Sequence, residues 1–113
     1  MTQMVSGEIT SYTARIYSKT SDERAFIYLY SPPSSTGCYL KFYNEAAVIP
    51  ENRLVLRDDG SKQLYISQRY SDYFNILDLV RNEKPVRFFY RDDVKLFYVN
   101  SGDEPVGEHE LSV

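Results

Sequence analysis

Few side chains in this sequence are of types that perform catalysis, and their arrangement does not favour it. Cys38 is the only cysteine and His109 the only histidine. A cysteine nucleophile needs a neighbouring base, but Leu40 and Phe42, which share a strand face with Cys38, are apolar, and this predicts a buried structural thiol. His109 lies between Glu108 and Glu110, which point to the opposite side in an extended segment. We therefore expect no catalytic cysteine, no metal centre and no cofactor.

Two pairs of carboxylates offer the other route to chemistry. Asp58-Asp59-Gly60 and Asp92-Asp93 resemble, in residue type, the acids that glycosidases and metal enzymes use. Both pairs fall where hairpin turns are expected, and Asp and Gly are favoured turn residues. Neither pair has the ligand spacing of a calcium loop. A small carboxylate-dependent enzyme is therefore the third and least favoured hypothesis, and the sequence predicts a non-enzymatic protein.

Aromatic residues are the more informative feature, since the chain holds 11 Tyr and 6 Phe. In the expected strands, several tyrosines lie opposite the aliphatic side chains, so they are predicted to form an outer surface. Cations accompany them, as in the pairs Arg87 with Phe89 and Lys95 with Phe97. The predicted binding residues are Tyr28, Tyr30, Tyr39, Lys41, Tyr43, Arg87, Phe89 and Lys95.

Three interpretations of this tyrosine-rich surface stay open. Tyrosine is a good strand former and packs well across strands, which is a structural role. Tyr, Phe and Arg are also enriched in protein interfaces, which favours a protein partner or a homo-oligomer. Rings interleaved with cations also suit single-stranded nucleic acid, with Lys41, Arg87 and Lys95 on phosphates and Tyr28, Tyr39 and Tyr43 under bases. Our first hypothesis is a binding or assembly module, and the nucleic-acid binder is the alternative.

The length and the net charge of the chain limit the number of domains and the kinds of partner that we expect. The chain has 113 residues and a net charge of −3, which fits one domain. Residues 101–113 hold Asp103, Glu104, Glu108 and Glu110 and no Lys or Arg, so the remaining residues carry 13 bases and 12 acids. We predict a single β domain over residues 1–100 followed by an acidic tail over 101–113. The net charge therefore argues only weakly against nucleic acid.

The beginning of the sequence has neither a positive segment nor an apolar one, so no signal peptide is expected. The apolar runs are only a few residues long, far short of a membrane span. The prediction is a cytoplasmic protein that does not associate with membranes.

Alternating polarity predicts strands over most of the chain. In the run from Ala25 to Tyr30, residues 25, 27 and 29 share one face, and Phe26, Tyr28 and Tyr30 share the other. The segment Ser31–Gly37 is predicted to be a loop. The other expected strands are Ile9 to Tyr17, Cys38 to Tyr43, a hairpin from Leu54 to Ile66 about Asp58–Ser61, and a hairpin from Val86 to Val99 about Arg91–Asp93. In the last hairpin, residues 86, 88 and 90 are expected to share one face, and residues 94, 96 and 98 another.

One helix is expected before the last hairpin. Tyr73, Ile76, Leu77 and Val80 form an apolar stripe at helical spacing. Ser71 or Asp72 is predicted to cap its start, and Lys84-Pro85 to end it.

This order of elements predicts a mainly β fold with one helix, either a small curled antiparallel sheet or an OB-like β-barrel with the helix before the last hairpin. The resemblance to an OB-type barrel lies in the order of elements, not in a motif. The OB pattern has three strands before the helix where five are expected here, which leaves a sandwich or an α+β roll open.

Overall fold

Two β-sheets and one α-helix make up the part of the chain that the computed structural model describes, residues 3–18 and 22–101. A three-stranded sheet has the order β1-β7-β8, with β1 (Met4–Ile9), β7 (Val86–Arg91) and β8 (Leu96–Ser101). A five-stranded sheet has the order β2-β3-β4-β6-β5, with β2 (Ser11–Ile16), β3 (Glu23–Ser31), β4 (Thr36–Tyr43), β6 (Lys62–Arg69) and β5 (Arg53–Leu56). The helix α1 spans Tyr73–Asn82.

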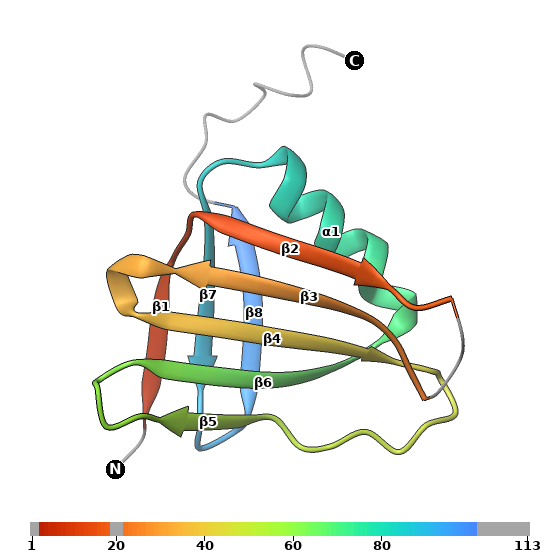
Figure 1. Cartoon of the computed structure of the whole chain (residues 1–113), viewed down its shortest axis with the longest axis horizontal. Coiled ribbons are helices and arrows are strands. Elements are labelled where there is room, and N and C mark those ends of the chain that lie inside the picture. Colours follow the sequence, from red (N-terminus) through yellow and green to blue (C-terminus); the bar gives the residue numbers. More distant parts are fainter. Residues whose placement is uncertain (1–2, 19–21, 102–113) are drawn as a thin grey trace.

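The two sheets lie face to face, and their strands run in different directions (Figure 1). The mainly β fold with one helix is therefore confirmed for the described residues. The OB-like barrel is not formed, because the strands belong to two separate sheets that do not close, which agrees with the small curled sheet. Each sheet turns one face inward and leaves the other on the outside of the molecule.

The core lies between the sheets and confirms the alternation expected for β3 and β4. Ile27 pairs with Leu40, and Leu29 pairs with Cys38, and all four side chains are fully buried. Leu64 and Ile66 on β6 continue this inner face. Burial of an aliphatic side chain of this size contributes about 1.5–3 kcal/mol relative to exposure. The aliphatic residues of these strands therefore occupy the inward positions, and other residue types occupy the outward positions.

The helix α1 completes the second layer beside β8 (Figure 1). Its apolar stripe faces the core as predicted, with Tyr73 and Val80 buried and Ile76 and Leu77 partly buried. The Tyr73 ring meets the Phe42 ring edge-on, with centroids 5.1 Å apart. Asp72 is the N-cap residue, but it makes no side-chain capping bond, so that part of the prediction is wrong. A 3-10 turn, Tyr70–Asp72, leads into the helix instead.

Two other expectations need correction. The expected strand from Ile9 to Tyr17 divides at Thr10, so that β1 and β2 belong to different sheets. The five-stranded sheet is not wholly antiparallel, because β4 and β6 are parallel neighbours. This follows from β5, which is inserted between them in the chain and pairs antiparallel with β6 at the sheet edge.

The loops also differ from expectation in detail. The connection between β3 and β4 is shorter than predicted, since Ser31 ends β3 and Gly37 belongs to β4. Val94 was expected on a strand, but it lies in the turn between β7 and β8. That turn extends to Lys95, which has a positive φ of 56°. Leu96 and Tyr98 do share a face, on the outside of the three-stranded sheet, while residues 86, 88 and 90 are buried as expected.

A polar network fastens this turn to the other sheet. The buried Tyr90 hydroxyl donates to Asp92 Oδ1 at 2.9 Å, and Lys95 Nζ donates to the same oxygen at 3.0 Å. Asn52 Nδ2 donates to the Lys95 carbonyl at 3.0 Å, while its Oδ1 accepts from the Ser67 amide at 2.8 Å. The Lys95 hydrogen bond, and after it that of Tyr90, holds the pKa of Asp92 below its ordinary value.

The lowered pKa of Asp92 makes stability depend on pH. The ionised group stabilises the fold above about pH 4, the ordinary Asp pKa, and this contribution is lost as pH falls through the lowered folded-state pKa. We expect Asp92→Asn to lower the free energy of unfolding at neutral pH and to have a progressively smaller effect in acid. Urea unfolding across this range measures the difference. Asp58→Asn, in an exposed turn, is the control, and an Asp92→Asn effect independent of pH would contradict the assignment.

Candidate binding surface

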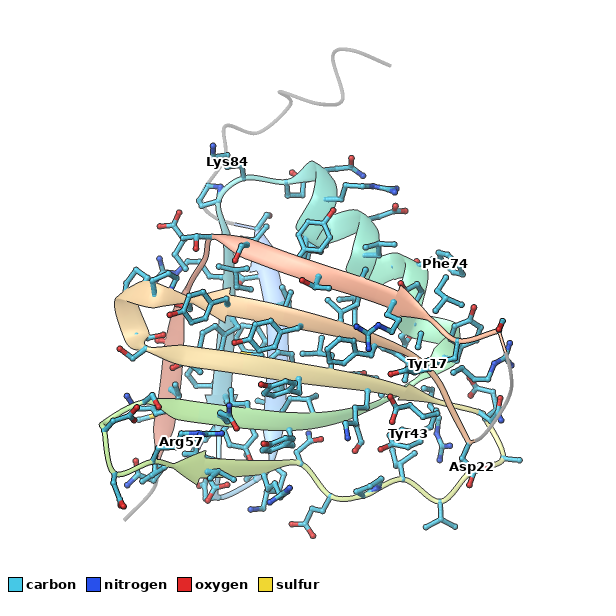
Figure 2. The ribbon with its side chains drawn as sticks, viewed as in Figure 1. Tyr17, Asp22, Tyr43, Arg57, Phe74 and Lys84 are labelled. Atoms are coloured by element: carbon cyan, nitrogen blue, oxygen red, sulfur yellow. The ribbon has the colours of Figure 1, made fainter. Side chains whose placement is uncertain are left out.

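The outer face of the five-stranded sheet is covered with aromatic side chains. We call it the phenolic face; it consists of Phe26, Tyr28, Tyr30, Tyr39, Lys41, Tyr43 and Tyr65, with Arg15 and Arg53 at its two sides. Figure 2 shows rings over β3, β4 and β6, with Tyr43 and Arg57 toward opposite ends of the sheet. Five of the predicted binding residues, Tyr28, Tyr30, Tyr39, Lys41 and Tyr43, therefore come together here.

A continuous row of side chains crosses all five strands of this face. Phe26 and Tyr39 are stacked with centroids 6.2 Å apart, and Tyr39 and Tyr65 with centroids 5.2 Å apart and planes 10° apart. The Arg15 guanidinium lies over the Phe26 ring at 5.5 Å. The Arg53 guanidinium lies over the Tyr65 ring at 4.3 Å. The row thus runs Arg15–Phe26–Tyr39–Tyr65–Arg53, with a cation at each end.

The row leaves ring edges and hydroxyls outward, because the broad faces of its rings are turned to one another. Each of its three rings has a neighbouring ring or guanidinium on either side. Tyr28 packs at a tilt on Tyr39, with centroids 4.7 Å apart, and stacks with Tyr30. Such contacts between rings contribute about 0.5–1.5 kcal/mol each beyond area burial. The face is therefore prepacked before any partner arrives.

Hydrogen bonds fix the phenols further. Gln63 Nε2 donates to the Tyr39 hydroxyl at 3.3 Å, and the Tyr65 hydroxyl donates to Gln63 Oε1 at 2.7 Å. Arg57 donates to the same oxygen at 2.6 Å. One amide side chain thus joins two rings of the row to a cation at the end of β5.

The sheet that carries this face is strongly cationic. Its five strands hold six basic residues and one acidic residue, whereas the sequence outside residues 101–113 is nearly neutral. The basic residues are Arg15, Arg24, Lys41, Arg53, Lys62 and Arg69, and the acidic residue is Glu23. Glu23 lies beside Tyr43, where burial, and after it this carboxylate, raises the pKa of the Tyr43 hydroxyl. Arg69 is occupied by the carbonyls of Asn44 and Ala47, at 2.8 and 2.6 Å.

Two shallow hollows indent the phenolic face. The larger, about 350 Å³, is bounded by Tyr28, Tyr30, Gly37, Arg57 and Lys62 among others. The smaller, about 80 Å³, lies against Lys41, Tyr43, Arg53 and Tyr65. Gly37 lines the larger hollow, and the Tyr28 side chain lies close to Gly37. A Cβ at position 37 would lie 2.5 Å from the Tyr28 hydroxyl oxygen.

The other predicted binding residues lie elsewhere. Arg87 and Phe89 are on the outer face of the three-stranded sheet, where Phe89 stacks with Tyr98 at 5.1 Å. Lys95 is in the β7–β8 turn, bonded to Asp92, and Phe97 points inward. The expectation that Arg87 and Lys95 share one face with Tyr39 is therefore wrong, because the two hairpins belong to different sheets.

Sequence reasoning also missed members of the row. Phe26 and Tyr65 have the same alternation as the residues chosen, so the signal was present. Arg15 and Arg53 join the row only through the registers Arg15 with Phe26 and Arg53 with Tyr65. The sequence of a single strand does not indicate which other strand it pairs with.

No cluster of metal-ligating side chains accompanies this surface within residues 3–18 and 22–101. Groups of three or more His, Cys, Asp or Glu that could hold a metal ion do not occur there. Asp59 accepts from the Ser61 amide and hydroxyl, at 2.9 and 2.6 Å, as a turn residue does. His109 and the acidic tail, apart from Ser101, lie outside the described residues.

A cavity of about 580 Å³ lies away from the phenolic face. It is bounded by the β1–β2 corner, with Glu8 and Tyr12, and by the end of α1 with Arg81 and Lys84. Its lining mixes apolar, acidic and basic groups and brings no nucleophile against a base, since its lining holds neither Cys nor His.

Comparison with known proteins leaves the surface to be interpreted from its own geometry: no family model, curated protein or solved structure matches this chain. Among the described residues, the helix is too short and too polar to cross a membrane.

The contact between Gly37 and Tyr28 gives a direct test of how tightly the face is packed. We expect Gly37→Ala to lower the free energy of unfolding by about 1–3 kcal/mol, the usual cost of overpacking. In a Tyr28→Ala background the same change should cost much less, because the obstructing ring is gone. Urea unfolding of the four proteins in this double-mutant cycle measures the coupling. Additive effects of the two changes would contradict the packing described.

Cys38 provides a second test, of its structural role. Burial raises the pKa of its thiol to about 12, so almost no thiolate forms near neutral pH. We expect a thiol reagent to label the native protein only as fast as the core opens, and labelling to accelerate as urea is added. Immediate labelling of the folded protein would contradict a buried thiol.

Proposed function

We propose that this protein is a non-enzymatic binding module whose phenolic face holds an acidic segment of a protein partner. The observation that carries the proposal is the row Arg15–Phe26–Tyr39–Tyr65–Arg53, which presents ring edges, hydroxyls and cations on one prepacked surface. Tyrosine and arginine are the residues that most often dominate binding energy at protein interfaces.

The packing of the row supports binding without a large entropic cost. Immobilising a free side chain at an interface costs about 0.5–1.5 kcal/mol. Here the rings are already held by one another and by Gln63. The cations of the phenolic face itself, Arg15, Lys41 and Arg53, favour an acidic partner over a basic one.

Single-stranded nucleic acid is the second candidate, and the cations Arg15, Lys41 and Arg53 of the phenolic face favour it. Stacking of bases, however, needs open ring faces. In this row the ring faces are turned to neighbouring rings and guanidinium groups. A base could stack only after the row had opened, whereas a protein segment can use the edges and hydroxyls as they stand.

Selection from a random peptide library on the purified protein tests the proposal. We expect the enriched peptides to be net negative, and Tyr39→Ala and Arg53→Glu each to weaken them at least tenfold, or about 1.4 kcal/mol. Tyr98→Ala and Arg87→Glu are the matched controls, since they change the same residue types on the outer face of the other sheet. These controls should bind the peptides as the unmodified protein does.

Two results would overturn the assignment to a protein partner. The first is a set of peptides whose affinity is insensitive to Tyr39→Ala and Arg53→Glu. The second is tight binding of a labelled oligothymidylate at low salt that Tyr39→Ala abolishes, with no acidic peptide enriched. That outcome would support the second candidate instead.

A further inference from the structure

The edge strand β2 differs from the other strands in its exposure. All six of its residues, Ser11–Ile16, are exposed, and among the strands of residues 3–18 and 22–101 only β3 pairs with it. In Figure 1 its other long edge has no strand beside it, and α1 lies beyond this edge in the layer behind, across a cavity lined by Ser11, Tyr12 and the end of α1. The opposite edge of the same sheet is formed by β5, which has four residues and is therefore a poorer template. Unpaired backbone groups along an edge strand favour pairing with another chain.

The direction of these unpaired groups follows from the register with β3. The Tyr17 amide donates to the Arg24 carbonyl at 3.0 Å, in the same register that places Arg15 opposite Phe26 and Thr13 opposite Tyr28. In an antiparallel ladder, hydrogen-bonded pairs recur every second residue. The odd-numbered residues of β2 therefore bond to β3, and the amides and carbonyls of residues 12, 14 and 16 point to the free edge.

The side chains of the same three residues are apolar and lie on the inner side of the sheet. Tyr12 pairs with Leu29 and Ile16 with Ala25, both of which are fully buried. Tyr12 and Ile16 themselves remain 38% and 51% exposed. Edge strands are usually protected by proline, by short length or by an inward charge. β2 has none of these, because its one charged residue, Arg15, points to the phenolic face and lies over Phe26.

We infer that two copies of this chain associate through β2, with the strands antiparallel about a two-fold axis at Ala14. Antiparallel pairing of identical edges is the arrangement that closes as a symmetric dimer. The inner side chains stay on the inner side only if even-numbered residues face even-numbered residues. With Ala14 opposite Ala14 of the second copy, Tyr12 faces Ile16 of the second copy, twice by symmetry, and the free groups of residues 12, 14 and 16 are all paired.

The sequence of β2 favours a second copy over an unrelated strand. Its apolar residues are placed symmetrically about Ala14, and Thr13 faces Arg15 on the outer side. Moving the axis to Thr13 would place Ile16 opposite Thr10, which lies outside the strand. The dimer forms one ten-stranded sheet with two phenolic faces side by side. This inference stands on the edge of the sheet and is independent of what the phenolic face binds.

Sedimentation of the full chain over a range of concentrations tests the dimer. We expect a monomer–dimer equilibrium whose dissociation constant rises at least tenfold with Ile16→Lys, because the charge enters the interface twice. Leu56→Lys is the matched control, since Leu56 is 56% exposed on the other edge strand of the same sheet. Monomer alone at every concentration up to about 1 mM would overturn the inference. So would equal effects of the two variants.

Amide hydrogen exchange of the unmodified protein tests the register. Exchange at residues 12, 14 and 16 should slow as the protein concentration rises, while the amides of Thr13 and Arg15, already bonded to β3, should change little. Thermal unfolding shows whether Ile16→Lys folds as the unmodified chain does. A dimer that leaves the amides of residues 12, 14 and 16 unprotected would show that another surface associates, and would overturn the inference.

Discussion

The pairing of β3 with β4 is the constraint on which the rest of the molecule depends. One register places Ile27 beside Leu40 on the inner face and Tyr28 beside Tyr39 on the outer face. A shift by one residue would exchange the two faces and expose every aliphatic side chain of the core. The hydrophobic core therefore fixes the positions of the outer rings, even though those rings contribute little to the core.

The parallel neighbour β6 extends this order to the whole sheet. Its register places Leu64 and Ile66 beside Cys38 and Leu40 inside, and Tyr65 beside Tyr39 outside. The short β5 then brings Arg53 to Tyr65, while β2 brings Arg15 to Phe26 on the far side. A row of five side chains from five strands thus arises from four pairings, and buried side chains lie beneath the pairings among β3, β4 and β6.

The sequence was sufficient where a pattern lies within one segment. The period of two in β3 and β4, the turn at Asp58–Ser61 and the helical stripe from Tyr73 to Val80 are local signals, and they are confirmed. The sequence was insufficient where the structure depends on which strands, distant in the chain, pair with one another. Thr10 looks like any other strand residue, but the chain changes sheets there. Lys95 fits the alternation expected for β8, but in the structure it lies in the turn between β7 and β8. The separation of Arg87 and Phe89 from Tyr39 follows only from the assignment of hairpins to sheets.

The change of sheet at Thr10 has a mechanical consequence. The Ile9 side of this residue is hydrogen-bonded into the three-stranded sheet and the Ser11 side into the five-stranded sheet. The Thr10 amide itself donates to the carbonyl of Tyr30, a residue of the phenolic face, at 3.0 Å. Because only Thr10 lies between β1 and β2, neither sheet can slide over the other without breaking strand pairs in both. Force applied along the edge of one sheet is thereby resisted by the ladder of the other, so the two layers yield together as one cooperative unit.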